Sequence, residues 1–201
     1  MSNSHLETEQ KYEADPGFTL PDLGAAAAVA GTQRYLLHAT YFDTDDLALN
    51  SRGVTLRRRT GGADAGWHLK LPVRTGTRQE VHAPLDEGTD EVPAELAAQV
   101  AQITAGRRLR PIATLDTERT MVTLAGPAGA VLAEVADDRV TATRLDRPGR
   151  QPTRWREIEV EAGSQDPAAL SAAEQAGMLL RRAGARPSSE GSKLARLLGS
   201  G

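Results

Sequence analysis

Charged side chains recur at every second position in several segments of this chain, and this period of two constrains the fold more than any other feature. In residues 6–14 (LETEQKYEA), Glu7, Glu9 and Lys11 occupy alternate positions. Residues two apart point to the same face of a β-strand, so these three side chains share one surface. The segment therefore predicts a strand with one strongly charged face.

Seven further segments have a similar alternating character and are bounded by turn signals. They are residues 35–44, 53–60, 66–73, 77–85, 112–125, 130–143 and 153–162. The sequence GGADA between the second and third of them predicts a β-hairpin. Strands joined mostly as a meander favour closure into a barrel, because an open sheet would leave long unpaired edges. We therefore expect an α+β fold, an eight-stranded antiparallel closed β-barrel with flanking helices.

Helical segments are expected between and after these strands. They are an alanine-rich stretch at 20–31, and residues 92–106, 166–184 and 190–199. The third begins with Asp166 as a predicted N-cap and Pro167 in the first turn, and Gly184 ends it. No internal repeat interrupts this order, so we expect one domain over residues 1–201, with 199–201 as a linker.

The composition excludes several classes of protein. The chain of 201 residues carries 24 basic and 27 acidic side chains, which argues against neutralising a nucleic-acid backbone over the whole surface. It has no cysteine, so disulfides and thiolate metal sites are excluded. No segment is apolar enough to be a signal peptide or to span a membrane, and we expect a cytoplasmic protein.

The charges fall into acidic and basic groups. Arg57 and Arg59 share one face of their predicted strand, while lysine occurs only at positions 11, 70 and 193. Arginine matches phosphate oxygens, and carboxylates two residues apart suit hard divalent cations. The pattern alone leaves two interpretations open. The charged faces either point outward, with salt bridges between strands, or point inward around a ligand.

The order of several short motifs resembles the CYTH domain, the triphosphate tunnel metalloenzyme superfamily. The motifs are ETEQK (a Glu-x-Glu-x-Lys pattern), YFDT, GVTLRRRTGG, WHLKLP, RQE, a late Glu-x-Glu strand and SKLARLLG, over residues 6–198. Within the superfamily the chain is most similar to bacterial inorganic triphosphatase-type domains that often precede a CHAD domain. The resemblance implies that the charged faces point inward, bind a triphosphate or polyphosphate, and require Mg²⁺ or Mn²⁺.

The resemblance also assigns roles to individual residues. Glu9 and Lys11 are the candidate catalytic residues, with Lys11 contacting phosphate or the attacking water. The candidate phosphate-binding residues are Lys11, Arg57, Arg59, Lys70, Arg78, Arg119 and Lys193. The candidate metal ligands are Glu7, Glu9, Glu80, Glu134, Asp138, Glu157, Glu159 and Glu161. Which pair of the last three acids binds metal stays open.

The expected reaction is hydrolysis of a phosphoanhydride bond of inorganic triphosphate or a related organic triphosphate. The same fold hosts class IV adenylyl cyclases and thiamine triphosphatases, and Trp155 is the one large ring placed to accept thiamine. A non-catalytic polyphosphate- or nucleotide-binding module would need only the basic residues, and a plain structural barrel would need neither group. Because both groups are present, the enzyme is favoured. A CHAD domain in a longer parent chain is the expected covalent partner.

Overall fold

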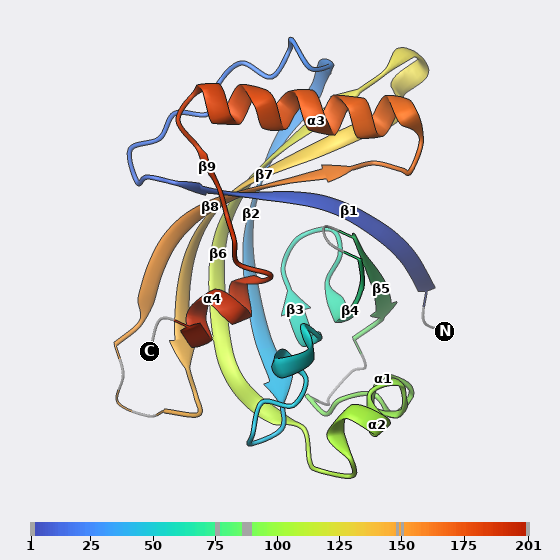
Figure 1. The fold of residues 1–201 in the computed structure, drawn as a ribbon, viewed down its shortest axis with the longest axis vertical. Coiled ribbons are helices and arrows are strands. Elements are labelled where there is room, and N and C mark those ends of the chain that lie inside the picture. Colours follow the sequence, from blue (N-terminus) through green and yellow to red (C-terminus); the bar gives the residue numbers. More distant parts are fainter. Residues whose placement is uncertain (1–2, 75–76, 86–89, 148, 150, 200–201) are drawn as a thin grey trace.

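The computed structural model describes residues 3–74, 77–85, 90–147, 149 and 151–199. Eight long strands occupy the segments predicted from the alternating pattern. They are β1 (Asn3–Ala14), β2 (Ala28–Asp43), β3 (Thr55–Thr60), β4 (Gly66–Arg74), β5 (Thr77–Ala83), β6 (Arg110–Ala125), β7 (Val131–Arg144) and β8 (Thr153–Ala162). Every pairing is antiparallel, and the order β5-β4-β3-β2-β6-β7-β8-β1 closes through a β1–β5 pairing. The expected closed barrel is confirmed (Figure 1).

Strand β1 forms the closure of the barrel. Its first half pairs with β5, from Asn3 to Thr8, and its second half pairs with β8, from Glu9 to Ala14. A two-residue strand, β9 (Arg186–Pro187), adds to the end of β1. The change of partner between Thr8 and Glu9 brings the first acids of the chain to the point where three strands meet.

Within the described residues four helices flank the barrel, and the alanine-rich stretch is not one of them. They are α1 (Ala94–Gln99), α2 (Ala101–Thr104), α3 (Pro167–Arg182) and α4 (Lys193–Gly199), with short 3₁₀ turns η1 (Asn50–Arg52) and η2 (Pro127–Gly129). The helix expected over 20–31 is wrong: a turn lies at 24–26 and β2 begins at Ala28. Pairing of Ala28 with Ala125 of β6 outweighs the helix propensity of alanine.

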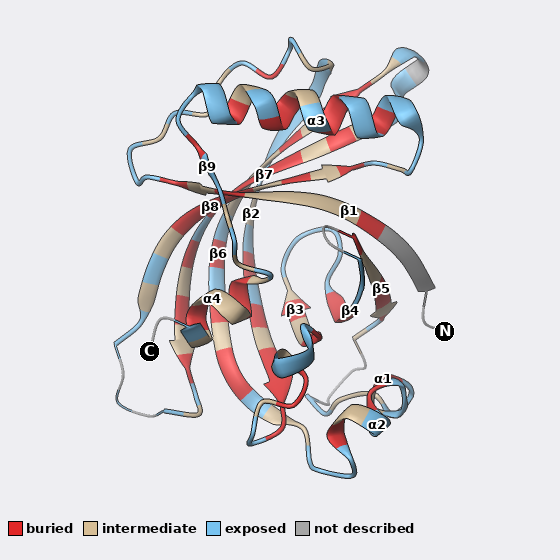
Figure 2. Ribbon diagram, viewed as in Figure 1, coloured by how far each residue is buried: buried red, intermediate tan, exposed pale blue. Residues whose placement is uncertain are grey.

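The apolar strand faces point outward, beneath the helices. Tyr12, Val135 and Val160 pack with Ala173 and Ala176 of α3 in one buried cluster. A second cluster places Trp67 and Leu69 of β4 under Leu96 and Val100 of the α1–α2 segment. Figure 2 shows this buried layer between α3 and the strands. Because successive residues of a strand alternate, the charged faces are left to point into the barrel.

Helix α4 covers one end of this interior. Its Leu194 and Leu197 pack with Tyr41, Leu115 and Val140 of the barrel strands. None of the helices in the described part of the chain has the length and hydrophobicity required to span a membrane. Part of the expected linker at 199–201 lies outside the described residues, and Gly199 ends α4.

Candidate functional site

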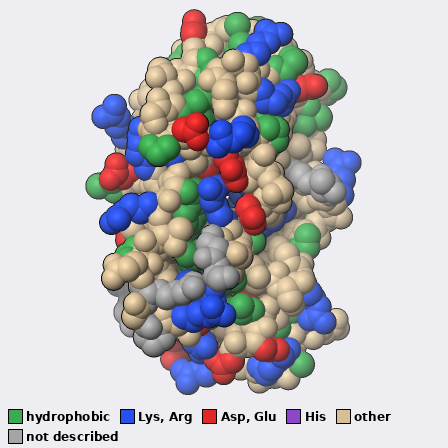
Figure 3. Space-filling model, turned by 60° about the vertical axis from the view of Figure 1, so that its left-hand side comes forward, with side chains coloured by type: hydrophobic (Ala, Val, Ile, Leu, Met, Phe, Trp, Pro, Cys, Tyr) green, Lys and Arg blue, Asp and Glu red, His purple; other side chains and the backbone are tan. Residues whose placement is uncertain are grey.

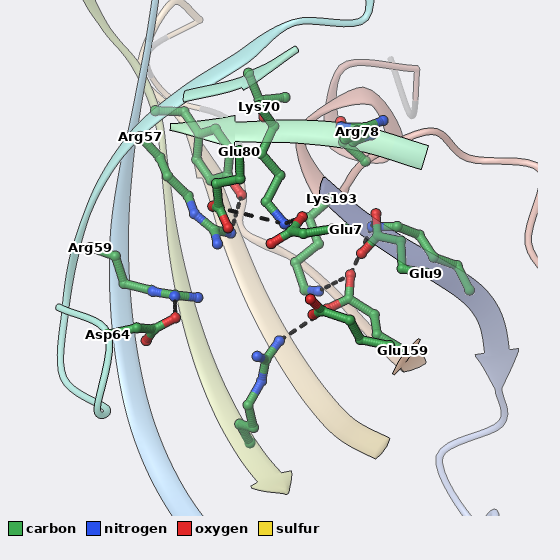
Figure 4. A pocket seen from close by; sticks show the side chains of 16 residues that line it. Glu7, Glu9, Arg57, Arg59, Asp64, Lys70, Arg78, Glu80, Glu159 and Lys193 are labelled. Atoms are coloured by element: carbon green, nitrogen blue, oxygen red, sulfur yellow. Dashed lines mark hydrogen bonds and ion pairs between the residues drawn. The ribbon is translucent and has the colours of Figure 1, made fainter. Parts of the chain in front are cut away.

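A cavity lies inside the barrel and is lined almost entirely by polar side chains. Seven are basic and six are acidic. The basic residues are Lys11, Arg57, Arg59, Lys70, Arg78, Arg119 and Lys193; the acidic ones are Glu7, Glu9, Asp64, Glu80, Glu159 and Glu161. Tyr41, Thr55 and Ser192 complete the lining. Every basic residue proposed from the sequence therefore reaches the same cavity (Figure 4).

The first strand supplies three of these side chains through its alternation. Glu7, Glu9 and Lys11 follow one another along the inner face of β1, and the register places Glu9 opposite Glu161 and Lys11 opposite Glu159 of β8. Directly opposite residues in an antiparallel pair share a face. Four carboxylates and one ammonium group therefore line one wall of the cavity.

Lys70 forms ion pairs with acids on two strands, Glu7 of β1 and Glu80 of β5. Its Nζ lies 2.5 Å from Glu7 Oε2 and 3.9 Å from Glu80 Oε1. Burial, together with a hydrogen bond that the protonated Glu7 carboxyl donates to the Glu80 carboxylate, raises the pKa of Glu7 to about 8. Burial likewise raises the pKa of Glu161 to about 7, with Glu9 and Glu159 adding repulsion. This wall of the cavity holds more negative charge than its lysines offset.

Lys193, the first residue of α4, compensates acids of β7 and β8. Its Nζ lies 2.8 Å from Glu157 Oε1, 2.9 Å from Glu159 Oε1 and 3.0 Å from Asp138 Oδ2. Arg119 donates two hydrogen bonds to Asp138, at 2.7 and 2.6 Å, and one to Glu159 at 3.0 Å. Burial alone would lower the pKa of Lys193, but these acids raise it well above its usual value. The C-terminal helix is thus tied to the cavity wall by charge.

The paired arginines of β3, Arg57 and Arg59, each keep one buried donor without a partner among the described residues. Arg57 Nη1 donates to the Tyr41 hydroxyl at 3.3 Å, and Arg59 Nη2 forms an ion pair with Asp64. The Nε atoms of Arg57 and Arg59 are buried without a hydrogen-bond partner among the described residues. A buried donor without a partner is costly, so these atoms are suited to a bound anion.

Three predicted metal ligands lie away from the cavity lining. Asp138 and Glu157 are not part of the lining, and both form ion pairs with Lys193. Glu134 lies opposite Glu161 in the β7–β8 register, but it is not part of the lining, and it accepts a hydrogen bond from Thr123 Oγ1 at 3.5 Å. These three acids share a strand face with the site without reaching its centre.

Four lining residues were absent from the predicted set. Thr55 shares the parity of Arg57 on β3, and this parity could have identified it. Tyr41 lies on the inner face of β2, where one aromatic residue among apolar neighbours gives little signal. Asp64 and Ser192 lie in connecting segments, and no periodicity marks either of them.

The cavity offers the donor type that Mg²⁺ and Mn²⁺ prefer. Both ions bind carboxylate oxygens, and five glutamates line the cavity: Glu7, Glu9, Glu80, Glu159 and Glu161. Burial is the main cause of the raised pKa values of Glu7 and Glu161, and a cation bound beside these groups would favour their ionised forms. In the described residues no three such side chains converge on one point, because lysines and arginines contact them instead. The chemistry of the donor set fits a divalent cation, and binding one requires these ion pairs to rearrange.

The outer surface carries charges of both signs. Figure 3 shows lysine and arginine side chains interspersed with acidic ones over one face, rather than gathered in a single basic area. On this face the charge pattern does not resemble an extended nucleic-acid footprint.

Comparison with known proteins places these features in a family. The family model described as "CYTH domain" matches residues 5–197. Two curated proteins of Mycobacterium tuberculosis, from strains CDC 1551 and H37Rv and each named an uncharacterized protein, are 40% identical over 207 residues, covering 97% of this chain. The chain spans only 40% of the length of each of these relatives.

Solved structures share the fold at low sequence identity. A putative adenylate cyclase from Bacillus halodurans has a TM-score of 0.67 at 19% identity, covering 96% of this chain and 97% of that one. A putative adenylate cyclase from Vibrio parahaemolyticus has a TM-score of 0.57 at 14% identity, covering 96% and 98%. The family model, matching nearly the whole chain, and this shared barrel lead to one conclusion: the chain belongs to the CYTH domain family.

Proposed function

We propose that this protein hydrolyses the phosphoanhydride bond of inorganic triphosphate, or of a related organic triphosphate, with a divalent metal ion. The observation that carries the proposal is the state of the β3 arginines. Arg57 and Arg59 line the polar cavity, and each keeps a buried Nε without a partner among the described residues. A chain of phosphate groups offers several charged acceptor oxygens to such donors.

The basic residues would bind the substrate and stabilise the charge that develops during transfer. Arg57, Arg59 and Lys70 would hold phosphate oxygens from one wall, with Arg119 and Lys193 on the other. Lys11, whose Nζ lies 3.6 Å from Glu9 Oε1, would contact a phosphate oxygen or orient the attacking water. These positioned charges lower the barrier because they need little rearrangement as the reaction proceeds.

The acids account for turnover rather than binding alone. Glu7, Glu9, Glu80, Glu159 and Glu161 would hold Mg²⁺ or Mn²⁺, which supplies charge neutralisation and a more acidic water when bound. A module that only binds polyphosphate needs the basic residues, and five carboxylates beside them would weaken anion binding. Their presence supports the hydrolase over the binding module.

The lining also favours inorganic triphosphate over a nucleotide or thiamine triphosphate. Two structural neighbours are named putative adenylate cyclases. A nucleobase or thiamine ring needs an aromatic or apolar surface, yet Tyr41 is the only ring among the described lining residues. Trp155 donates to Glu157 Oε2 at 2.5 Å and packs with the α4 cluster instead of lining the cavity. A CHAD domain in a longer parent chain and a cytoplasmic location belong to the same proposal.

Two neighbouring arginines provide a matched test. Arg57 faces the cavity, whereas Arg58 faces away and pairs with Asp90 through a 3.1 Å contact. We expect Arg57→Gln to lower phosphate release from tripolyphosphate by about 100-fold or more, in line with losing a charge-stabilising donor. Arg58→Gln should stay within about twofold of the wild type, because Arg58 is not part of the cavity lining. Equal effects of the two changes, measured as steady-state rates, would contradict the proposal.

A further inference from the structure

The turn between β3 and β4 places a carboxylate against an arginine of the proposed phosphate site. Asp64 lies in this turn and forms an ion pair with Arg59 Nη2 (Figure 4). The Arg59 side chain is 6% exposed, whereas that of Asp64 is 57% exposed. The pair therefore joins a buried cation to a carboxylate that reaches into solvent. Asp64 is also the one acid of the described lining that comes from a turn rather than a strand.

The backbone of this turn is held in place, so the position of Asp64 is a built feature of the turn. Gly61 has φ +76°, and a Cβ there would lie 2.1 Å from the Leu36 carbonyl oxygen. The Asp64 carbonyl oxygen lies 2.9 Å from His68 Nε2, and His68 Nδ1 lies 2.8 Å from Glu80 Oε1. The main chain is thus anchored at both ends of the turn, while the Asp64 carboxylate extends towards Arg59.

Arg59 needs an anion more than an ordinary arginine does. Burial, with repulsion from Arg57 and Arg119, lowers its pKa to about 9. Among the described residues Asp64 is the one carboxylate within ion-pair distance of Arg59. A phosphate group bound at Arg59 would meet the same guanidinium from inside the cavity. The two anions cannot both approach closely, because their charges repel.

We propose that Asp64 is an intramolecular competitor of substrate phosphate for Arg59, and that it sets the affinity of the cavity for triphosphate. This inference rests on the proposed function. When a triphosphate enters, the Asp64 carboxylate moves from Arg59 into solvent, which its exposure allows. Asp64 is an affinity-setting residue, and it takes no part in the chemical step.

The test is a calorimetric titration of tripolyphosphate into three proteins in metal-free buffer. Asp64→Asn keeps the size of the side chain and removes its charge. Asp45→Asn is the matched control, because Asp45 is an exposed loop aspartate that pairs with Arg110 outside the cavity. We expect Asp64→Asn to bind about threefold to tenfold more tightly than the wild type, the range for losing one partly exposed competing ion pair. Asp45→Asn should match the wild type.

A double-variant cycle ties the effect to Arg59. In an Arg59→Gln background, Asp64→Asn should bring no gain, since the cation for which Asp64 competes is gone. A gain that persists there would overturn the proposal, because it would reflect general repulsion near the opening. Equal or weaker binding by Asp64→Asn in the otherwise wild-type protein would overturn it as well.

Phosphate release, measured in parallel, separates this inference from the proposed function. Tighter binding by Asp64→Asn without hydrolysis by any protein refutes the hydrolase and leaves the competitor intact. Hydrolysis with unchanged binding refutes the competitor and leaves the hydrolase intact. If no protein binds tripolyphosphate, both are refuted.

Discussion

Replacing Lys193 with methionine should strongly destabilise the protein. Methionine keeps most of the side-chain volume but leaves Asp138, Glu157 and Glu159 without the ammonium group that lies 2.8 to 3.0 Å from each of them. Removing one partner of a buried ion pair costs about 3–5 kcal/mol. Arg119 still contacts two of the three acids, so we expect a loss of about that size rather than a sum over three pairs.

The loss is measured by urea unfolding at pH 7 in buffer free of metal and phosphate. Arg196→Met is the matched control, since it removes a cation from the same helix. Arg196 Nη1 lies 3.3 Å from Glu13 Oε1, and its side chain is 22% exposed. We expect the control to lose no more than about 1 kcal/mol, as a partly exposed pair should.

The pH dependence follows from the acids that Lys193 compensates. Burial alone would raise the pKa of Glu159, but Lys11, Lys193 and Arg119 hold it well below its usual value. This stabilisation is present above the unfolded pKa of Glu159 and is lost as the pH falls through the folded one. In Lys193→Met the folded pKa rises, so the deficit relative to the wild type should be complete at pH 7 and shrink as the pH falls below the usual value of 4.5. A deficit below about 1 kcal/mol, or one independent of pH, would refute the reasoning.

Two further predictions concern the stability of the metal-free protein, one on its pH dependence and one on glycine substitutions. Burial raises the pKa of Glu7 to about 8 and that of Glu161 to about 7, so the folded state keeps protons that the unfolded state has lost. The free energy of unfolding should therefore fall from pH 5 to pH 7 by up to about 1.4 kcal/mol per pH unit for each group. Glu7→Gln should flatten this slope when it is measured by urea titration. A wild-type free energy that does not change with pH would contradict the raised pKa values. Gly61→Ala should cost more than about 2 kcal/mol, because its Cβ meets the Leu36 carbonyl. Gly106→Ala, with φ +77° but open space around it, should cost about 1 kcal/mol; equal losses in thermal unfolding would contradict the steric argument.

The strands and their closure were predictable because period-two alternation is a local property of the sequence. Each of the eight predicted segments is a strand, and the motif order indicated the family. The direction of the charged faces was not predictable from alternation, since inward and outward arrangements give the same pattern. The helix predicted for the alanine-rich stretch was wrong for a related reason. Ala28 pairs with β6, and such a long-range contact cannot be inferred from local helix propensity.

The site was predictable as far as strand parity reaches. Parity placed Arg57, Lys70 and Glu159 on the charged faces of their strands, and all three line the cavity. It does not encode the position along the barrel axis, which separates Glu134 from the cavity although it lies opposite Glu161. Strand parity also predicts nothing about residues in turns, and Asp64 lies in a turn.

The central claim is that the charged interior hydrolyses a triphosphate with a divalent metal ion. The most direct measurement is the rate of phosphate release from tripolyphosphate, with and without Mg²⁺ or Mn²⁺, beside ATP and pyrophosphate, for the wild type and Glu9→Gln. The account predicts metal-dependent release that is fastest with tripolyphosphate and is lost in Glu9→Gln. Tight binding of tripolyphosphate without release from any of the three substrates would contradict it and leave a binding module.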